Sequence, residues 1–172
     1  MNHNISIQTD RLHIVPLHSS HAEFILRLFN NKEFLYFIGD KNIRNHDQAI
    51  EFIESSIANP LRYYWVVRTL KELQSIGFIS LMRKDFLEDW DYGFAFLPEH
   101  RKMGFAYEST RAIMEPIKTI IHFTKISAVV MPENMNSMNL LTRLGFIFDQ
   151  SIVHEKESLD VYKKILKSQL SI

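Results

Sequence analysis

The chain has 172 residues, with 20 lysines and arginines against 20 aspartates and glutamates, no cysteine and only five glycines. No two glycines are spaced as in the phosphate-binding motifs G-x-G-x-x-G or G-x-x-x-x-G-K-[ST], and the lack of cysteine excludes thiolate catalysis, disulfides and cysteine-ligated metals. A net charge of zero offers no overall attraction to nucleic acid or to an anionic membrane.

The first half of the chain predicts one strand, two helices and then three more strands. The helices are indicated by the capping-box spacing of Ser20–Glu23 and by the apolar stripe within Ile50–Ile57. The polar pair Lys71–Glu72 separates two β-rich runs, which indicates a hairpin. The predicted bounds are Leu12–Val15, Ser20–Phe29, Asn45–Ile57, Tyr63–Arg68, Ser75–Met82 and Trp90–Leu97, with a loop over Asn31–Asn45.

The second half alternates helices with strands. A helix is expected over Met103–His122, and Pro116 should kink or end it, because proline lacks an amide donor and clashes with the preceding turn. The elements that follow are a strand, a short helix and two strands, over Lys125–Met131, Asn136–Leu144, Phe146–Val153 and Leu159–Ile165. A strand–helix–strand connection requires a crossover, so the sequence predicts a parallel pair within a larger mixed sheet.

Residues 1–172 are therefore expected to form a single α/β domain (α+β by stricter naming), with a mixed sheet of about seven strands flanked by about four helices. The polar start Met1–Asn4 leads directly into a strand pattern, and no apolar run approaches the roughly 18 residues of a membrane span. We expect a cytoplasmic protein without a membrane segment.

The turn between the strand ending at Leu97 and the next helix carries the first chemical signal. The first amides of a helix have no internal partners and a partial positive charge, so they attract an anion. Gly104 has no Cβ and Ala106 has only a methyl group, so a phosphate can approach the backbone closely, while Arg101 and Lys102 add positive charge. The turn predicts a phosphate or pyrophosphate site at Arg101–Ala106, and a solvated basic turn is the alternative.

A second segment, Pro132–Phe146, reads P-E-N-M-N-S-M-N-L-L-T-R-L-G-F. The two segments together resemble the GNAT superfamily of N-acetyltransferases, in particular its ribosomal-protein-type (RimJ/RimL-like) branch. The matched patterns are [QR]-x-x-G-x-[GA] at Arg101, Gly104 and Ala106, N-x-x-S…L-G-F at Asn134, Ser137 and Leu144–Phe146, and shorter matches at Thr9–Leu12, Ile76–Phe78 and Tyr92–Phe94. The resemblance extends from about Thr9 to Phe146.

The resemblance implies acetyl-CoA as the acetyl donor, and a fold in which the fourth and fifth predicted strands splay apart. It implies that the pyrophosphate lies on the amides of Lys102, Met103, Gly104, Phe105 and Ala106, with Arg101 framing the turn. It also implies that the pantetheine arm pairs with the backbone of Phe96 and Leu97, while Asn134 and Ser137 contact it from the opposite wall.

Attack on a thioester requires a neutral amine. Deprotonation at pH 7 costs about 4.6 kcal/mol for a lysine of pKa ~10.4, but only about 1 kcal/mol for an α-amine of pKa ~7.8. Asp91, which strand alternation places on one face with Gly93, Ala95 and Leu97, is the candidate general base, and in the family an acidic residue often occupies this position. A structural aspartate at the start of a strand is the alternative interpretation.

Many relatives protonate the departing thiolate with a tyrosine four residues before the glycine of the Gly-Phe pair, where this chain has Leu141. A thiol has a pKa near ~8.5, so its thiolate is a tolerable leaving group without a strong acid. Ser137 is the substitute candidate, either as a weak acid or only as a cofactor contact.

The sequence thus predicts an acyltransferase, an acetyl-CoA-dependent N-acetyltransferase in which a primary amine attacks directly in a ternary complex. The acceptor is a protein N-terminus, which the branch favours, or a polyamine, an amino acid or an antibiotic amine. A non-catalytic acyl-CoA-binding regulatory module is the alternative from another class. No metal is expected, because His18 and His21 have no third ligand at a recognisable spacing. No nucleic-acid or membrane partner is expected, and the chain is expected to be a monomer or homodimer.

Overall fold

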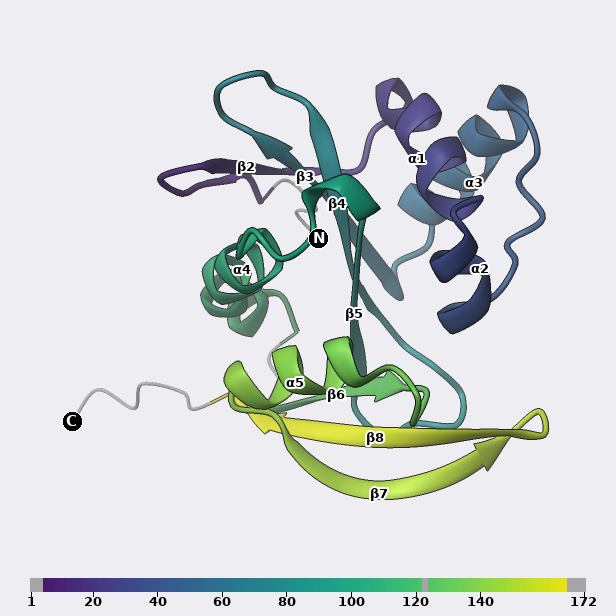
Figure 1. The fold of residues 1–172 in the computed structure, drawn as a ribbon, viewed down its shortest axis with the longest axis vertical. Helices are drawn as coiled ribbons and strands as arrows, with labels where there is room; N and C mark the ends of the chain where they lie inside the picture. The colour runs from purple at the N-terminus through teal and green to yellow at the C-terminus, as the bar shows by residue number, and fades with distance from the viewer. Residues whose placement is uncertain (1–4, 122–123, 167–172) are drawn as a thin grey trace.

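An eight-stranded mixed sheet organises the chain in a computed structural model, which describes residues 5–121 and 124–166, with only the backbone of residues 119–121 (Figure 1). The strands are β1 (Ile7–Gln8), β2 (Leu12–Pro16), β3 (Arg62–Thr69), β4 (Ser75–Met82), β5 (Trp90–Phe96), β6 (Lys125–Val130), β7 (Ile147–His154) and β8 (Glu157–Ile165). The α-helices are α1 (Ala22–Phe29), α2 (Lys32–Phe37), α3 (His46–Ala58), α4 (Phe105–Ile121) and α5 (Met135–Arg143). The observed architecture confirms the predicted α/β class.

The sheet separates two layers of helices. Its strand order is β1-β2-β3-β4-β5-β6-β8-β7, and every neighbouring pair is antiparallel except β5 and β6. Figure 1 shows α1, α2 and α3 on one side of β5 and α4 on the other. Val66, Phe78 and Leu97 belong to the core beneath α1 and α3, whereas residues that alternate with them along the strands pack toward α4 and α5.

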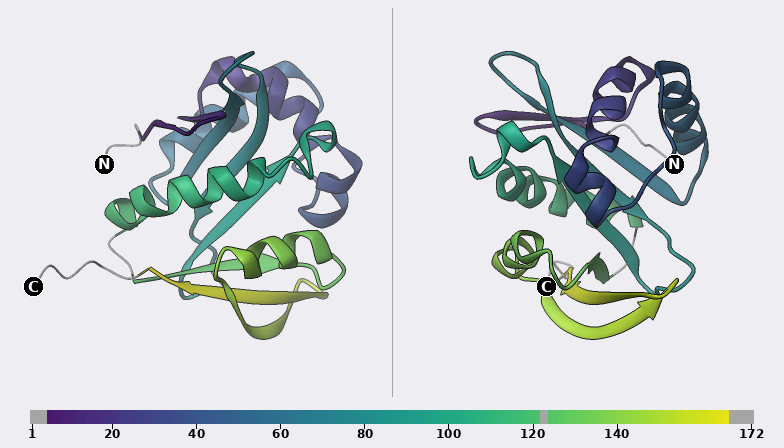
Figure 2. Two further views of the ribbon diagram at one scale, coloured as in Figure 1. Left: turned by 60° about the vertical axis from the view of Figure 1, so that its left-hand side comes forward. Right: turned by 45° about the vertical axis from the view of Figure 1, so that its right-hand side comes forward.

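The strands β5 and β6 part soon after they meet. They pair through only Trp90 with Ile126 and Asp91 with Ser127, after which β5 continues to Phe96 with no partner on β6. Figures 1 and 2 both show β5 diverging from β6 and β8. We call this divergence, between Tyr92–Phe96 and the later part of β6, the fork. It confirms the predicted splay.

One helix lies where the sequence indicated a loop, and the strand pattern after Met1–Asn4 forms only the two-residue strand β1. The predicted loop Asn31–Asn45 contains α2, which has six residues, is capped by the Asn31 side chain and buries Phe34 against Phe29 at a ring-centroid distance of 4.4 Å. A helix of fewer than two turns is too short to show a helical period, and the two residues of β1 are too few to alternate.

The sequence predicts that Pro116 kinks or ends its helix, and the second of these outcomes is wrong, since α4 continues through the proline to Ile121. Ile113, Met114 and Ile117 are all buried around the proline, and their packing outweighs one lost backbone hydrogen bond. The predicted end of this helix at His122 lies outside the described residues. Within residues 5–121 and 124–166, no helix combines the length and the apolar character that crossing a membrane requires.

Candidate active site

The turn before α4 presents free backbone amides. Lys102 and Gly104 have φ values of 58° and 82°, and the Gly104 carbonyl accepts the first helical hydrogen bond, from the Glu108 amide at 3.0 Å. The amides of Phe105–Tyr107 therefore have no acceptor within the helix. The helices α2, α3 and α5 each begin with an asparagine whose side chain accepts a first-turn amide: Asn31, Asn45 and Asn134. A glycine at the start of α4 cannot do this, so its amides remain open to an anion.

Arg101 connects this turn to two other elements. Its Nε donates to the Phe96 carbonyl at 2.9 Å, and its guanidinium forms an ion pair with Glu33 on α2. Arg101 therefore supports the turn by joining the end of β5 to the wall formed by α2, and Glu33 balances its charge. Lys102 and Met103 are exposed at the turn, so Lys102 presents its charge to solvent there.

The backbone of β5 at the fork has a defined polarity. Alternate residues of a strand direct their N–H and C=O groups to opposite edges. The amide of Leu97 donates to the Ile76 carbonyl on β4 at 3.0 Å, so it is unavailable at the fork. By alternation, the backbone N–H and C=O groups of Phe94 and Phe96 point to the other edge of β5, from which β6 has diverged. The expectation of a pantetheine contact at Phe96 and Leu97 is therefore wrong for the Leu97 amide, and the fork-facing candidates are the backbones of Phe94 and Phe96.

Asp91 lies at the apex of the fork. Its side chain is nearly completely buried; Oδ2 lies 2.8 Å from Lys84 Nζ, and Oδ1 accepts the Val129 amide at 3.2 Å. Val129 is two residues beyond Ser127, the last β6 residue paired with β5. The Asp91 carboxylate therefore accepts the amide that would otherwise pair with the β5 backbone. Burial raises the pKa of Asp91 above its ordinary value, although Lys84 and the Val129 amide oppose this shift.

The sheet face beside Asp91 is ordered in cross-strand rows. Asp91 pairs with Met82, which pairs with Arg62, and the next row consists of Gly93, Ser80 and Tyr64. Directly paired residues direct their side chains to the same face. A Cβ at Gly93 would lie 2.6 Å from Ser80 Oγ, so a side chain there would displace the Ser80 hydroxyl; with glycine, the row next to Asp91 has backbone in place of a side chain.

The opposite wall is formed by α5. Asn134 caps this helix, its Oδ1 accepting the Ser137 amide at 3.2 Å, and Ser137 is partly buried in the first turn. Leu141 is 2% exposed and belongs to the core between α4 and the sheet. The position at which the resemblance leads us to expect a tyrosine is thus packed as hydrophobic core.

Sequence reasoning missed several participants. Alternation alone could have identified Phe94, because consecutive residues such as Phe96 and Leu97 cannot direct their amides to the same edge. Lys84 and Glu33 had no comparable signal, since each lies in a segment without a period and meets its partner only in the folded chain.

Comparison with known proteins identifies the family. A sequence model of the acetyltransferase (GNAT) domain matches residues 11–147. The chain is also 31% identical over 146 residues to the uncharacterized N-acetyltransferase YoaA of Bacillus subtilis (strain 168), covering 81% of each protein. This chain belongs to the GNAT acetyltransferases. It is therefore an acyltransferase of a family that binds coenzyme A.

Solved structures share the whole fold. The ribosomal-protein-S5-alanine acetyltransferase from Vibrio fischeri superposes with a TM-score of 0.81 at 17% identity, covering 94% of this chain and 97% of that one. The spermidine N-acetyltransferase from Vibrio cholerae, solved with CoA and spermine, gives 0.79 at 20% identity, covering 92% and 97%. At these identities the likeness establishes the GNAT fold.

Proposed function

We propose that this acyltransferase transfers acetyl from acetyl-CoA to the α-amine of a protein N-terminus, by direct attack of the amine on the thioester. The observation that carries the proposal is the unpaired edge of β5, which leads directly into the open amides of α4. An extended arm with a diphosphate at one end matches such an edge followed by an anion-binding turn.

The donor is assigned along this path. The diphosphate binds the amides of Lys102–Ala106, and the pantetheine arm pairs with the fork-facing backbone of Phe94 and Phe96. The backbone amides of Phe94 and Phe96 also polarise the thioester carbonyl as negative charge develops on its oxygen. Asn134 and Ser137 contact the arm from α5. No covalent enzyme intermediate is required, since the chain has no cysteine.

Asp91 is assigned as the general base, acting directly or through a water. A buried carboxylate with a raised pKa is a stronger proton acceptor than an ordinary aspartate. An α-amine needs only modest help, because its pKa of ~7.8 is close to neutral pH. A carboxylate base such as Asp91 is therefore sufficient for an N-terminal α-amine.

The charges around Asp91 favour an N-terminus over a polyamine. Lys84 already neutralises Asp91, and Arg62 lies in the same cross-strand row. A polyamine carries further positive charges, each of which needs a carboxylate when it is desolvated. Three acidic side chains of α2, the loop after it and the turn before α4 are already paired with arginines: Glu33 with Arg101, Asp40 with Arg44 and Glu99 with Arg27. The fold neighbours do not decide between these acceptors, since they include a ribosomal-protein-S5-alanine acetyltransferase and a spermidine N-acetyltransferase.

Thiol release from acetyl-CoA with a panel of amines tests the proposal. We expect turnover with peptides that have a free N-terminus and none with the same peptides Nα-acetylated, which is the matched control. Spermidine should give a kcat/KM at least about tenfold lower, the equivalent of one unfavourable charge contact of ~1.4 kcal/mol. A preference for spermidine would overturn the acceptor assignment. Coenzyme A binding without turnover on any amine would indicate a regulatory module instead.

A further inference from the structure

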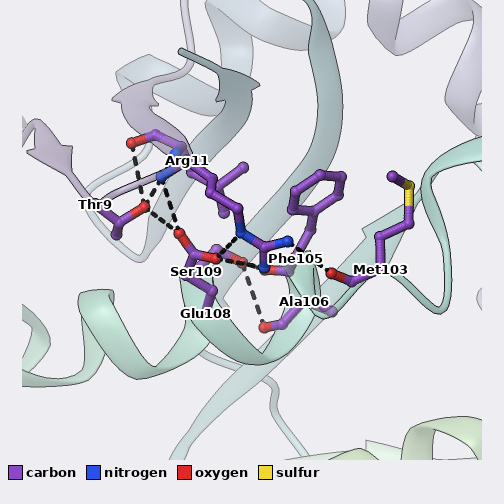
Figure 3. Close-up of polar contacts among 8 residues, drawn as sticks. Thr9, Arg11, Met103, Phe105, Ala106, Glu108 and Ser109 are labelled. Carbon is purple, nitrogen blue, oxygen red and sulfur yellow. Dashed lines mark hydrogen bonds and ion pairs between the residues drawn. The ribbon is translucent and has the colours of Figure 1, made fainter. Parts of the chain in front are cut away.

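The segment between β1 and β2 holds the first turn of α4. Glu108 Oε1 accepts the Thr9 hydroxyl at 2.5 Å and the Arg11 amide at 3.3 Å, while its Oε2 accepts Arg11 Nε at 2.7 Å and lies 2.6 Å from Nη2 (Figure 3). These partners are nearly 100 residues apart in sequence. Thr9 and Arg11 belong to the Thr9–Leu12 pattern, for which the reaction itself has no evident need.

Arg11 also reaches the turn itself. Its Nη1 donates to the Met103 carbonyl at 3.0 Å, and its guanidinium carbon lies 4.6 Å from the centre of the Phe105 ring. A Cβ at Gly104 would lie 3.3 Å from Arg11 Nη2. One guanidinium therefore joins Glu108, in the first turn of α4, to Met103, which lies within the stretch of amides to which the diphosphate is assigned.

Two physical effects follow from this geometry. The turn contains the unfavourable positive φ of Lys102, and a carbonyl held by Arg11 resists relaxation away from it. Glu108 would also repel a nearby diphosphate, but Arg11 neutralises it. Burial alone would raise the pKa of Glu108, whereas the hydrogen bonds from Thr9 and Arg11 hold it below its ordinary value, so the carboxyl is ionised at neutral pH.

We propose that Arg11 is a positioning residue for the donor: it fixes the Met103–Phe105 turn in the shape that receives the diphosphate and cancels the charge of Glu108 beside it. This inference rests on the proposed function, and it adds a role for the N-terminal pattern. It requires no direct contact between Arg11 and the cofactor.

The test compares two donors, one with and one without the diphosphate. Arg11→Ala should weaken coenzyme A binding, measured by calorimetry, on the order of tenfold or more, the expected effect of losing a charge-assisted hydrogen bond. The same variant should leave kcat/KM for S-acetylpantetheine, which has no diphosphate, within about twofold of the wild type. Arg11→Lys, which keeps the charge but cannot span both partners, should lose most of the same affinity.

Arg68→Ala is the matched control. Arg68 Nε likewise donates to a turn carbonyl, that of Leu73 at 2.9 Å, in the β3–β4 hairpin, so this variant removes a comparable arginine–carbonyl hydrogen bond at a different turn. It should bind coenzyme A as the wild type does. Equal losses with both donors in Arg11→Ala, or unchanged coenzyme A affinity, would overturn the inference alone. A wild-type protein that binds no coenzyme A would refute the proposed function as well.

Discussion

The turn before α4 and the apex of the fork differ in which groups remain available for binding or chemistry once their charged side chains are paired. At the turn, Arg11 and Arg101 are each paired with a glutamate, and the groups left open are backbone amides. At the apex, the buried carboxylate of Asp91 contacts Lys84 and the Val129 amide, so the group assigned to accept a proton is a side chain. We therefore expect function at the turn to depend on backbone shape, and function at the apex to depend on the identity of one residue.

The largest effect is expected at the apex. Asp91→Asn keeps the size of the side chain but removes the base, and kcat/KM with an N-terminal peptide should fall about a hundredfold, a typical contribution of general-base catalysis. Steady-state kinetics as a function of pH is the measurement. In the wild type, activity should rise with pH through a limb above the usual range of aspartate, because burial raises the Asp91 pKa and only the ionised form accepts a proton. A variant that melts earlier but turns over normally would make Asp91 purely structural.

A smaller effect is expected at the turn, where the comparison can be made between two glycines. Gly104→Val forces a branched side chain into a positive φ of 82° and crowds Arg11, so coenzyme A affinity should fall on the order of tenfold or more. Gly39→Val imposes similar strain at φ 95° with nothing within 4 Å of the new Cβ. Both variants should lose stability in thermal unfolding, but only the first should lose affinity. Equal affinities would show that the turn does not hold the diphosphate.

The smallest effect is expected from Lys84→Met. This variant should shift the acid limb of the pH profile of kcat/KM more than it lowers the maximal rate. Lys84 opposes the burial-driven rise in the Asp91 pKa, so its removal raises that pKa further. The acid limb of kcat/KM should then shift to higher pH, while the affinity for coenzyme A stays the same. A shift to lower pH, or none, would contradict the assignment of that limb to Asp91.

The two regions also differ in how far the sequence predicts them. The turn and its open amides were predictable, because they follow from a local pattern, Arg101 to Ala106 between a strand and a helix; its binding of a diphosphate stays a prediction. Asp91 could be placed on the correct strand face, but its partners come from a loop and from β6 and leave no trace in local periodicity. The continuation of α4 past Pro116 likewise depends on core packing that a local rule does not contain.

The short β5–β6 junction has a consequence for the stability of the whole molecule. Among the described residues, the β6–β8 part of the sheet is joined to β5 and the residue before it by only two backbone pairings and by the side-chain contacts of Asp91 with Val129 and of Ser127 with Asp89; the rest of its attachment includes packing in the shared core. A donor bound in the fork would hydrogen-bond the edge of β5 that β6 leaves unpaired, and the substrate would thereby help to hold the two parts of the sheet together. Since a ligand bound only by the folded state adds about 2.7 kcal/mol at a hundred times its dissociation constant, resistance to unfolding would rise and fall with the supply of acetyl-CoA.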